Sequence, residues 1–479
     1  MGGANAATQS LSSDLTGDSV ENSEGQVWFV HPDLGIGGAE MLIVNAAVAL
    51  LKDHGRDVQI FTAHHDPKRC FAETTDGGPL SSRVHVYGSW LPRKIVGRFH
   101  AVCAILRMIW ISFVLGARIS LGFCERPAVI VCDVVSHVVP LLRLLTGSQV
   151  VFYCHFPDKL LCVERGSFLK RAYRMPMDWW EESSTGAADA VVVNSKFTAG
   201  VFRESFTSLS KKDVGVLYPA IDMQEFDRSL SKDQIEKAHQ GFPPELKTHL
   251  STWTSDAILL VSVNRFERKK NLMLAVEALR QVKSKVDSEF FDKTHLVLAG
   301  GYDTRLEENV EYVKELQARV KELDLQGKVS FLLSFSNDQR LELFKLARCV
   351  LYTPDREHFG IVPIEAMYAG CPVVAIASGG PLETIIEGET GFLTKQDPVD
   401  YGTAIAKFVT NSSLADKFGS QGRKWVTKTF SLAAFGNQLN EIIQRHEHPA
   451  HLSKAMLGTL SFGLLVASLI TYIILARLH

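Results

Sequence analysis

Two basic side chains, Arg265 and Lys270, lie five positions apart after the apolar run 259–263 and before a helix-like stretch. The carboxyl ends of parallel strands line the ligand crevice of an open α/β sheet. Two cations at such a strand end could hold a diphosphate and stabilise its charge as it leaves, without a metal ion. A solvated basic turn would explain the same residues.

Two carboxylates, Glu357 and Glu365, flank an apolar strand-to-helix turn with seven residues between them. Gly360, Ile361 and Val362 lie at the expected helix start, where free N–H groups can take a phosphate oxygen. Glu365 then falls on the first turns of the helix, where it could accept hydrogen bonds from ribose hydroxyls. Glu357 precedes the turn and could face a sugar ring.

A glycine-rich turn, with Gly35, Gly37 and Gly38, follows the first apolar run and begins a helix-like stretch. Backbone N–H groups at Gly37 and Gly38 could approach an anionic ligand. Glu40 occupies the last position of the dinucleotide fingerprint, where its carboxylate would crowd a pyrophosphate. A tight strand-to-helix turn is therefore an equal explanation. A second such loop is Gly379–Pro381.

Histidine side chains give two further candidates of unequal weight. His155 follows the apolar run 150–153, so we expect it at a strand end, where its imidazole could bond to a sugar or an attacking hydroxyl. His137 is the weaker candidate, because a single histidine in the run 134–139 is more often a satisfied core residue.

The elements that must position these residues form two successive α/β halves. Short apolar runs alternating with helical stretches indicate parallel sheets covered on both faces. Two such halves imply two doubly wound, Rossmann-like domains that face each other across a cleft. The expected strands are 27–30, 58–61, 84–87, 128–132, 150–153 and 190–193 in the first half, and 258–263, 295–299, 329–333, 350–352 and 373–376 in the second.

The domain boundaries follow from breaks in this alternation of apolar runs and helical stretches. We expect a disordered tail over 1–25, a first domain over 26–222, a second over 223–430, a helix and connector over 431–454, and a membrane anchor over 455–477. Residues 217–222 and the polar stretch 227–252, with its glycine and two prolines, are interpreted as a linker and a variable loop.

Length and composition limit the classes of protein. The 479 residues allow two or three domains. The net charge of −2 removes the main electrostatic signature of a nucleic-acid-binding protein. The eight cysteines form no C-x-x-C pair and no zinc-ligand spacing with histidine, so we expect free thiols in a reducing compartment.

Two apolar segments stand out. Residues 456–476 are free of charge and match one bilayer span, which predicts a C-terminal transmembrane helix. The first 25 residues have no signal-peptide pattern, so the domains are expected in the cytosol. Residues 99–121 contain His100, Arg107 and Arg118. This segment could lie on an anionic membrane surface, or it could be a buried helix.

Taken together, Arg265 and Lys270, the Glu357–Glu365 pair, the Gly37–Gly38 turn and the block 188–197 resemble the retaining glycosyltransferases of family 4. This resemblance covers nearly all of residues 26–446. It implies the GT-B fold, with an N-terminal domain that binds the acceptor and a C-terminal domain that binds the donor nucleotide.

Within that family, the segments HPDLGIGGAE, FYCHFPD, NRFERKKN and EHFGIVPIEAM resemble the mannosyltransferases of the asparagine-linked glycosylation pathway. The closer resemblance implies GDP-mannose as donor and dolichol-diphosphate-linked oligosaccharide as acceptor. It also implies α-1,3 and then α-1,6 linkages, no metal cofactor, and work at the cytosolic face of the endoplasmic reticulum membrane. Other mannosyltransferases of that pathway are the protein partners it suggests.

The family pattern also assigns roles. It implies that Arg265 and Lys270 bind the donor diphosphate, that Glu365 binds the ribose, and that Glu357 lies near the transferred sugar. His155 matches the family's active-site histidine. The helix start at 360–362 would contribute to donor binding, and Gly37 and Gly38 would shape the cleft near the phosphate and the acceptor.

Other functions remain open at this point. The donor could be a UDP-sugar, or the acceptor another lipid such as phosphatidylinositol. A nicotinamide-dependent enzyme is disfavoured by Glu40 and by the lack of a Tyr-x-x-x-Lys pair. A membrane scaffold that kept the fold would be expected to have lost Arg265, Lys270 or Glu357, and all three are present.

Overall fold

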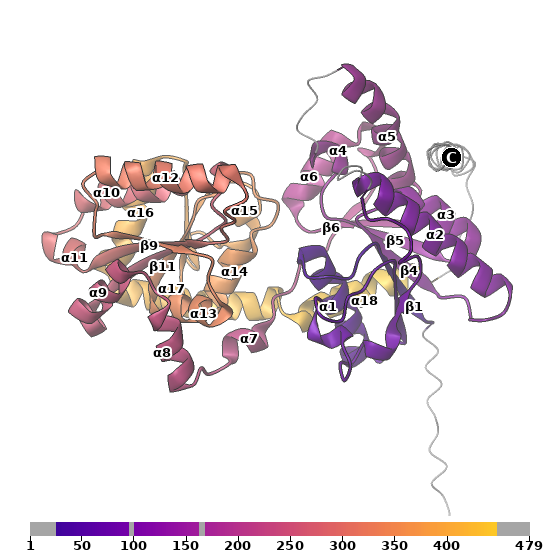
Figure 1. The fold of residues 1–479 in the computed structure, drawn as a ribbon, viewed down its shortest axis with the longest axis horizontal. Coiled ribbons are helices and arrows are strands. Elements are labelled where there is room, and N and C mark those ends of the chain that lie inside the picture. The colour runs from indigo at the N-terminus through magenta and orange to yellow at the C-terminus, as the bar shows by residue number, and fades with distance from the viewer. Residues whose placement is uncertain (1–24, 95–99, 162–167, 448–479) are drawn as a thin grey trace, which may run out of the picture.

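The computed structural model describes residues 25–94, 100–161 and 168–447. These residues form two α/β lobes, joined near the middle of the molecule (Figure 1). The tail expected over 1–25 (apart from Gly25) and the anchor expected over 455–477 lie outside the described residues.

The first lobe contains a seven-stranded sheet in the order β3-β2-β1-β4-β5-β6-β7, and all neighbouring strands are parallel. The strands are β1 (Val27–His31), β2 (Val58–Thr62), β3 (Val84–Val86), β4 (Val129–Asp133), β5 (Gln149–Cys154), β6 (Ala190–Val193) and β7 (Val214–Val216). The pattern predicted the first six. It missed β7 because this edge strand is only three residues long and contains Gly215.

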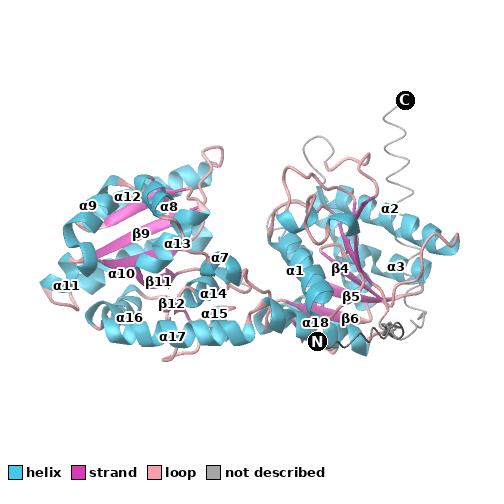
Figure 2. Cartoon of the chain, turned by 90° about the horizontal axis from the view of Figure 1, so that it is seen from below, coloured by secondary structure: helices cyan, strands magenta, loops and turns pink. Residues whose placement is uncertain are grey.

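Helices cover both faces of this sheet. They are α1 (Gly38–Asp53), α2 (His100–Ser120), α3 (Val139–Thr146), α4 (Asp158–Leu161), α5 (Phe168–Gly186), α6 (Lys196–Ser205) and α18 (Leu432–Arg445). Successive residues of β1 point to opposite sides: Phe29 packs with α1 and α18, whereas Val30 packs with α2 and α3. Figure 2 shows α1 and α2 on opposite sides of the strands.

The second lobe contains a six-stranded parallel sheet in the order β10-β9-β8-β11-β12-β13. Its strands are β8 (Ile258–Val263), β9 (Thr294–Gly300), β10 (Val329–Leu333), β11 (Ala347–Tyr352), β12 (Val373–Ile376) and β13 (Gly391–Thr394). The second parallel sheet was predicted, although not its edge strand β13. The two expected Rossmann-like halves are therefore confirmed.

The remaining helices belong to this lobe. They are α7 (Met223–Asp227), α8 (Lys232–Gln240), α9 (Pro244–Trp253), α10 (Leu272–Lys283), α11 (Ser288–Asp292), α12 (Glu307–Glu322), α13 (Asn337–Leu346), α14 (Ile361–Tyr368), α15 (Pro381–Thr384), α16 (Pro398–Thr410) and α17 (Ser412–Thr429). Short 3-10 turns are η1 (Ala72–Thr74), η2 (Ser81–Arg83), η3 (Ser136–Val138), η4 (Thr207–Leu209), η5 (Thr254–Asp256) and η6 (Arg268–Lys270).

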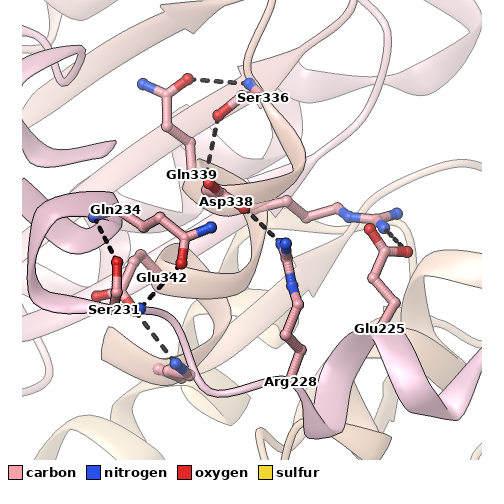
Figure 3. A network of polar contacts seen from close by, with 10 residues as sticks. Glu225, Arg228, Ser231, Gln234, Ser336, Asp338, Gln339 and Glu342 are labelled. Atoms are coloured by element: carbon pink, nitrogen blue, oxygen red, sulfur yellow. Dashed lines mark hydrogen bonds and ion pairs between the residues drawn. The ribbon is translucent and has the colours of Figure 1, made fainter. Parts of the chain in front are cut away.

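The interpretation of 227–252 as a variable loop is wrong, because α8 and α9 lie there. The residues taken as loop signals are the helix ends: Gly241 ends α8 and Pro244 begins α9. Figure 3 shows how the segment is held. Arg228 bonds to Asp338 of α13, and the capping boxes of α8 and α13 lie side by side. These contacts make the segment an ordered part of the lobe.

Helix α2 belongs to the fold of the first lobe. Within the described residues it is the one helix long and apolar enough to cross a membrane, and 44% of its most apolar window is buried inside the protein. Met108, Ile111 and Leu115 pack against the sheet. Trp110 and Phe113, on the other side, are 40% and 42% exposed. The helix is thus both a core element and the carrier of an exposed aromatic surface.

Seven of the eight cysteines lie in the described part of the chain, and all seven are free thiols. Five are buried, including Cys132 at the centre of the first sheet. Burial raises the pKa of the Cys132 thiol well above its ordinary value. These cysteines therefore act as small core residues.

The chain crosses between the lobes twice. It leaves the first lobe after β7 and returns after α17, so that α18 packs on α1 (Figure 1). The two crossings meet where the Ile221 amide donates to the Phe430 carbonyl, 3.2 Å away. At the end of the described chain, Arg56, which is buried, pairs with Glu447 and donates to Asn440.

Glu383 of the second lobe forms the main polar contact between the lobes. Its carboxylate accepts hydrogen bonds from the amides of Lys196 and Phe197, at 2.8 and 2.7 Å, and from the Tyr218 hydroxyl at 2.9 Å. Lys196 and Phe197 begin α6 of the first lobe, so the carboxylate also lies at the positive end of that helix dipole. Ser195, which caps α6, donates to the carbonyl oxygen of His358.

We expect the substitution Glu383→Gln to loosen the two lobes, because a neutral amide offers one acceptor oxygen where two amides and a hydroxyl now donate. The free energy of the contact between the lobes should become less favourable by about 1–2 kcal/mol. Faster hydrogen exchange at the amides of Lys196 and Phe197 would measure it. Glu389→Gln is the control, because this position is exposed and its side chain makes no hydrogen bond with the described residues. Unchanged exchange at both amides would contradict this assignment.

Candidate active site

Three side chains meet at the carboxyl ends of neighbouring strands in the first lobe. His31 ends β1, Asp133 ends β4, and His155 follows β5. One oxygen of Asp133 lies 2.6 Å from His31 Nδ1, and the other lies 2.9 Å from His155 Nε2. His31 and Asp133 are buried, whereas the His155 side chain is 28% exposed. Of these three side chains, only His155 is therefore accessible to a ligand.

The charges of this trio determine the direction of its hydrogen bonds. Burial alone would raise the pKa of Asp133, but the His31 charge and the bonds from both imidazoles outweigh it and lower the pKa. Burial would lower the pKa of His31, and the Asp133 charge reverses that effect and raises it. An ionised carboxylate only accepts hydrogen bonds, so His155 donates through Nε2. Its Nδ1 lone pair then has no partner among the described residues.

The sequence reasoning found His155 and missed His31 and Asp133. The available signal was position: each lies at the carboxyl end of an apolar run, and β1, β4 and β5 are neighbours in the sheet. The order of these strands is not readable from the sequence. Nothing therefore linked positions 31 and 133.

Lys270 and Glu357 form the corresponding cluster in the second lobe. Their side chains make an ion pair and are 13% and 25% exposed. Lys270 ends the turn η6, and its carbonyl accepts the Thr353 hydroxyl at 2.7 Å, which ties this turn to the end of β11. The structure thus brings together a cation and a carboxylate that lie 87 positions apart.

Arg265 also follows β8, but its guanidinium pairs with Glu267 at 2.8 Å and is 63% exposed. It makes no hydrogen bond or ion pair with Lys270 or Glu357. Its accessible charge is the one that an incoming anion would meet first.

The loop that carries Glu357 is held by close backbone approach. Gly379 has φ = 65°, and the Gly380 amide donates to the Glu357 carbonyl at 2.8 Å. A Cβ at Gly380 would lie 2.1 Å from the Phe359 carbonyl oxygen. The two glycines therefore let the loop after β12 pack directly on the segment before α14.

Helix α14 begins at Ile361, within the segment 360–362 where a helix start was expected. Gly360 is its N-cap, with φ = 82°, and the helix has no side-chain cap. The N–H groups of Ile361 and Val362, in the first turn, have no acceptor within the helix. The expected helix start is thus present, and its binding of a phosphate stays a prediction.

Glu365 lies deeper than Glu357 and in a different network. Its carboxylate pairs with Arg340 at 2.9 Å, and Arg340 also pairs with Glu225 at 2.8 Å. Burial raises the pKa of Glu365 to about 7, although the Arg340 charge opposes the shift. Arg340 and Glu225 were not predicted, because neither belongs to a motif and their contacts join residues far apart in the sequence.

The glycine-rich turn lies at the start of α1. Gly37 is the N-cap of this helix, and a Cβ there would lie 2.3 Å from Glu40 Oε2. Glu40 thus folds back over Gly37. Gly38 is exposed, and a Cβ there would meet nothing within 4 Å.

The lobes bring the two clusters to the same junction. The ring of Phe156 stacks on His358, with centroids 3.7 Å apart and planes 14° apart. These are the residues that directly follow His155 and Glu357. A pocket of about 270 Å³ opens beside His155 and is lined by α2, η3 and α5. His137 also lines it, edge-on to Trp180.

Metal ligands were not expected. Within residues 25–94, 100–161 and 168–447, no three His, Cys, Asp or Glu side chains are grouped so that they could hold a metal ion.

Comparisons with known families agree with this geometry. Residues 36–225 match the family described as Glycosyltransferase Family 4, and residues 251–425 match Glycosyl transferases group 1. Among solved structures, HepE of Anabaena in complex with UDP is similar with a TM-score of 0.59 and 18% identity, covering 88% of this chain and 100% of that one. Sucrose-phosphate synthase of Thermosynechococcus elongatus gives 0.60 and 20%, covering 88% and 99%. These likenesses confirm the two-domain GT-B fold.

Closer relatives share most of their length with this chain. The human α-1,3/1,6-mannosyltransferase ALG2 is 46% identical over 422 residues, which cover 88% of this chain and 95% of that protein. The Dictyostelium discoideum protein of the same name is 41% identical, with coverage of 89% and 99%. The Saccharomyces cerevisiae protein is 37% identical, with coverage of 89% and 86%. The chain therefore belongs to glycosyltransferase family 4 and, within it, to the family of ALG2 α-1,3/1,6-mannosyltransferases.

Proposed function

We propose that this protein transfers mannose from GDP-mannose to dolichol-diphosphate-linked oligosaccharide, first in α-1,3 and then in α-1,6 linkage. The observation that carries the proposal is the junction itself: His155 of one lobe and the Lys270–Glu357 pair of the other directly adjoin the stacked rings of Phe156 and His358. A reaction between a donor held by one lobe and an acceptor held by the other needs this arrangement.

The donor is assigned to the second lobe. Lys270 and the accessible Arg265 supply positive charge for the diphosphate, and the N–H groups at 360–362 supply hydrogen bonds. Glu365 is the assigned acceptor for ribose hydroxyls, and Arg340 holds its carboxylate in place. We assign the stabilisation of the leaving charge to these groups, and the proposal includes no metal ion.

The acceptor is assigned to the first lobe, between the Gly37–Gly38 turn and His155. Nε2 of His155 is hydrogen-bonded to Asp133. The other ring nitrogen, Nδ1, is therefore the atom that can accept a hydrogen bond from a sugar hydroxyl. A hydrogen bond accepted there would orient the attacking oxygen.

Departure of GDP creates negative charge on the diphosphate and positive charge at the anomeric carbon. Lys270 is paired with Glu357 before the reaction, so its Nζ is already held close to the proposed leaving group. Such preorganised charge lowers the barrier more than charge that must first move into place. We assign retention to attack from the face that GDP leaves, within a short-lived ion pair.

The proposed location is the endoplasmic reticulum membrane, with both lobes in the cytosol. The uncharged segment 456–476 would be the anchor. Other mannosyltransferases of the same lipid-linked pathway are proposed partners.

The donor assignment is tested by incubating the full chain with a mannosylated, diphosphate-linked lipid acceptor and either GDP-mannose or a UDP-sugar. We expect product only from GDP-mannose, with both linkages present. Lys270→Ala should reduce the rate at least about 10²-fold, because it removes a charge aimed at the leaving group.

Two controls accompany this assay. Lys269→Ala removes a neighbouring, 66% exposed charge that pairs with Glu267, and it should retain most activity. GDP, and not UDP, should raise the melting temperature of the wild-type chain. Stabilisation by UDP alone would exclude GDP-mannose as the donor.

The role of His155 is tested through Asp133→Asn. An amide in place of the carboxylate can accept a hydrogen bond from one imidazole only, so His155 loses its fixed orientation or its proton position. We expect kcat to fall about 10²-fold with little change in KM. The pH–rate profile should also change, because the His31–Asp133 charge pair is lost.

Asp213→Asn is the control for loss of a carboxylate, because this position is exposed and no hydrogen bond joins its side chain to the part of the chain that the structure describes. Melting temperatures separate misfolding from loss of catalysis. A kcat and pH profile equal to those of the wild type would exclude Asp133 as the group that orients His155.

A further inference from the structure

A second pocket of the first lobe is not used by the proposed chemistry. It has a volume of about 480 Å³ and lies between the end of β1 and the start of α2. Three cations, Arg93, Lys94 and Arg107, line it together with His100 and one carboxylate, Asp33. Two positive charges therefore remain uncompensated in the pocket, which favours an anionic occupant.

The single carboxylate is already neutralised. Arg107 binds both oxygens of Asp33, one of them at 3.1 Å, and its side chain is only 4% exposed. A guanidinium held this way is fixed in position. Its Nε–H is buried and has no hydrogen-bond partner among the described residues, so one donor of the pocket wall remains unused.

The other two cations are accessible. Arg93 reaches Asp33 only at 3.3 Å and is 59% exposed, so it can turn towards a ligand. Lys94 is exposed and makes no ion pair or hydrogen bond with the described residues. The cationic pocket thus combines a fixed guanidinium with two movable charges, a set that suits the several oxygens of a phosphate or diphosphate.

The cationic pocket adjoins the pocket beside His155. Ala101 and Ala104 of α2 line both. Only these two small side chains of α2 are common to the two pockets, so a ligand that lies along the start of α2 could occupy both. One end would then lie at His155 and the other at Arg93 and Lys94.

An exposed aromatic surface lies beside the cationic pocket. Trp90, only three residues before Arg93, packs edge-on against Trp110 of α2, with centroids 5.5 Å apart. Trp90 and Phe113 are 69% and 42% exposed. Trp110 is one helical turn from Arg107, so apolar and cationic contacts are neighbours on the same helix. An anion that continues into an apolar chain matches this combination.

We propose that the cationic pocket binds the diphosphate of the lipid-linked acceptor, with the glycan extending to His155 and the isoprenoid lying along the exposed face of α2. The inference rests on the proposed function and adds a binding site to it. Arg93 and Lys94 are the contacts that hold the diphosphate, and Arg107 forms the wall behind it.

The test compares two acceptors that carry the same mannosylated glycan on the same short isoprenoid, one joined through a diphosphate and one through a glycosidic bond. Both are assayed with the full chain in detergent without phospholipid. The double variant Arg93→Ala/Lys94→Ala removes two charge-assisted contacts. It should raise the KM of the diphosphate acceptor about 30-fold and leave kcat nearly unchanged. The KM of the acceptor without diphosphate should not change.

The control is Arg203→Ala/Lys211→Ala, which removes one exposed arginine and one exposed lysine of the same lobe. It should leave both KM values unchanged. In the wild type, added salt should weaken only the acceptor that carries the diphosphate, because salt screens exposed charges. Melting temperatures show whether each variant is folded.

Three outcomes would overturn the inference. The first is an unchanged KM for the diphosphate acceptor in the Arg93/Lys94 variant. The second is an equal rise for both acceptors, which would assign these residues to the glycan or the chain. The third is lost binding to vesicles of anionic phospholipid with an unaltered KM in detergent, which would make a phospholipid headgroup the occupant.

Binding of a fluorescent derivative of each acceptor, measured without donor, separates this inference from the proposed function. A wild-type chain that transfers no mannose but binds the diphosphate acceptor more tightly than the Arg93/Lys94 variant would refute the function and support the site. Equal affinities of the wild type and the variant would refute the site, whether or not mannose is transferred.

Discussion

The stacking of Phe156 on His358 is the contact on which the arrangement of the candidate site depends. Each ring belongs to a different lobe, and each directly follows a residue proposed to act in the reaction. The bonds of Glu383 to the start of α6 hold the lobes together in the same region, so ring stacking and a charged helix cap act jointly. Water has less access to charges between two such lobes. The charge of Lys270 therefore interacts more strongly with an anion there than it would on an open surface.

The sequence was most informative where a single strand and the loop after it contain all the residues of a recognisable pattern. Parallel strands buried on both faces, such as β4 and β8, are recognisable as continuous apolar runs. Lys270 and Glu357 were identified by motif. Their pairing requires β8 and β11 to be neighbours in the sheet, and no local sequence pattern predicts that order. His31 and Asp133 were missed for the same reason. The error at 227–252 had another cause: proline and glycine at helix ends were interpreted as signs of a loop.

Burial divides the charged groups of the molecule into two kinds. Asp133 is buried and Glu365 is only 12% exposed, and His31 and Arg340 hold them in place, so their proposed roles are to orient a neighbour or to accept bonds in one geometry. Arg93, Lys94 and Arg265 are accessible, and such side chains can follow a ligand as it enters. The transfer proposed above, from one diphosphate carrier to another, would use both kinds of group, because its substrates carry several negative charges and must also be released.

The return of α18 to the first lobe has a mechanical consequence. In topology the second lobe is an insertion into the first, attached through two chain segments that are hydrogen-bonded to each other at Ile221 and Phe430. Two attachments pinned side by side behave as one hinge. A rotation of the second lobe about that point would open the junction between the lobes without breaking either attachment. The last described residue, Glu447, pairs with Arg56 of the first lobe, so the proposed anchor of residues 455–477 would be joined to the chain on the side of the first lobe.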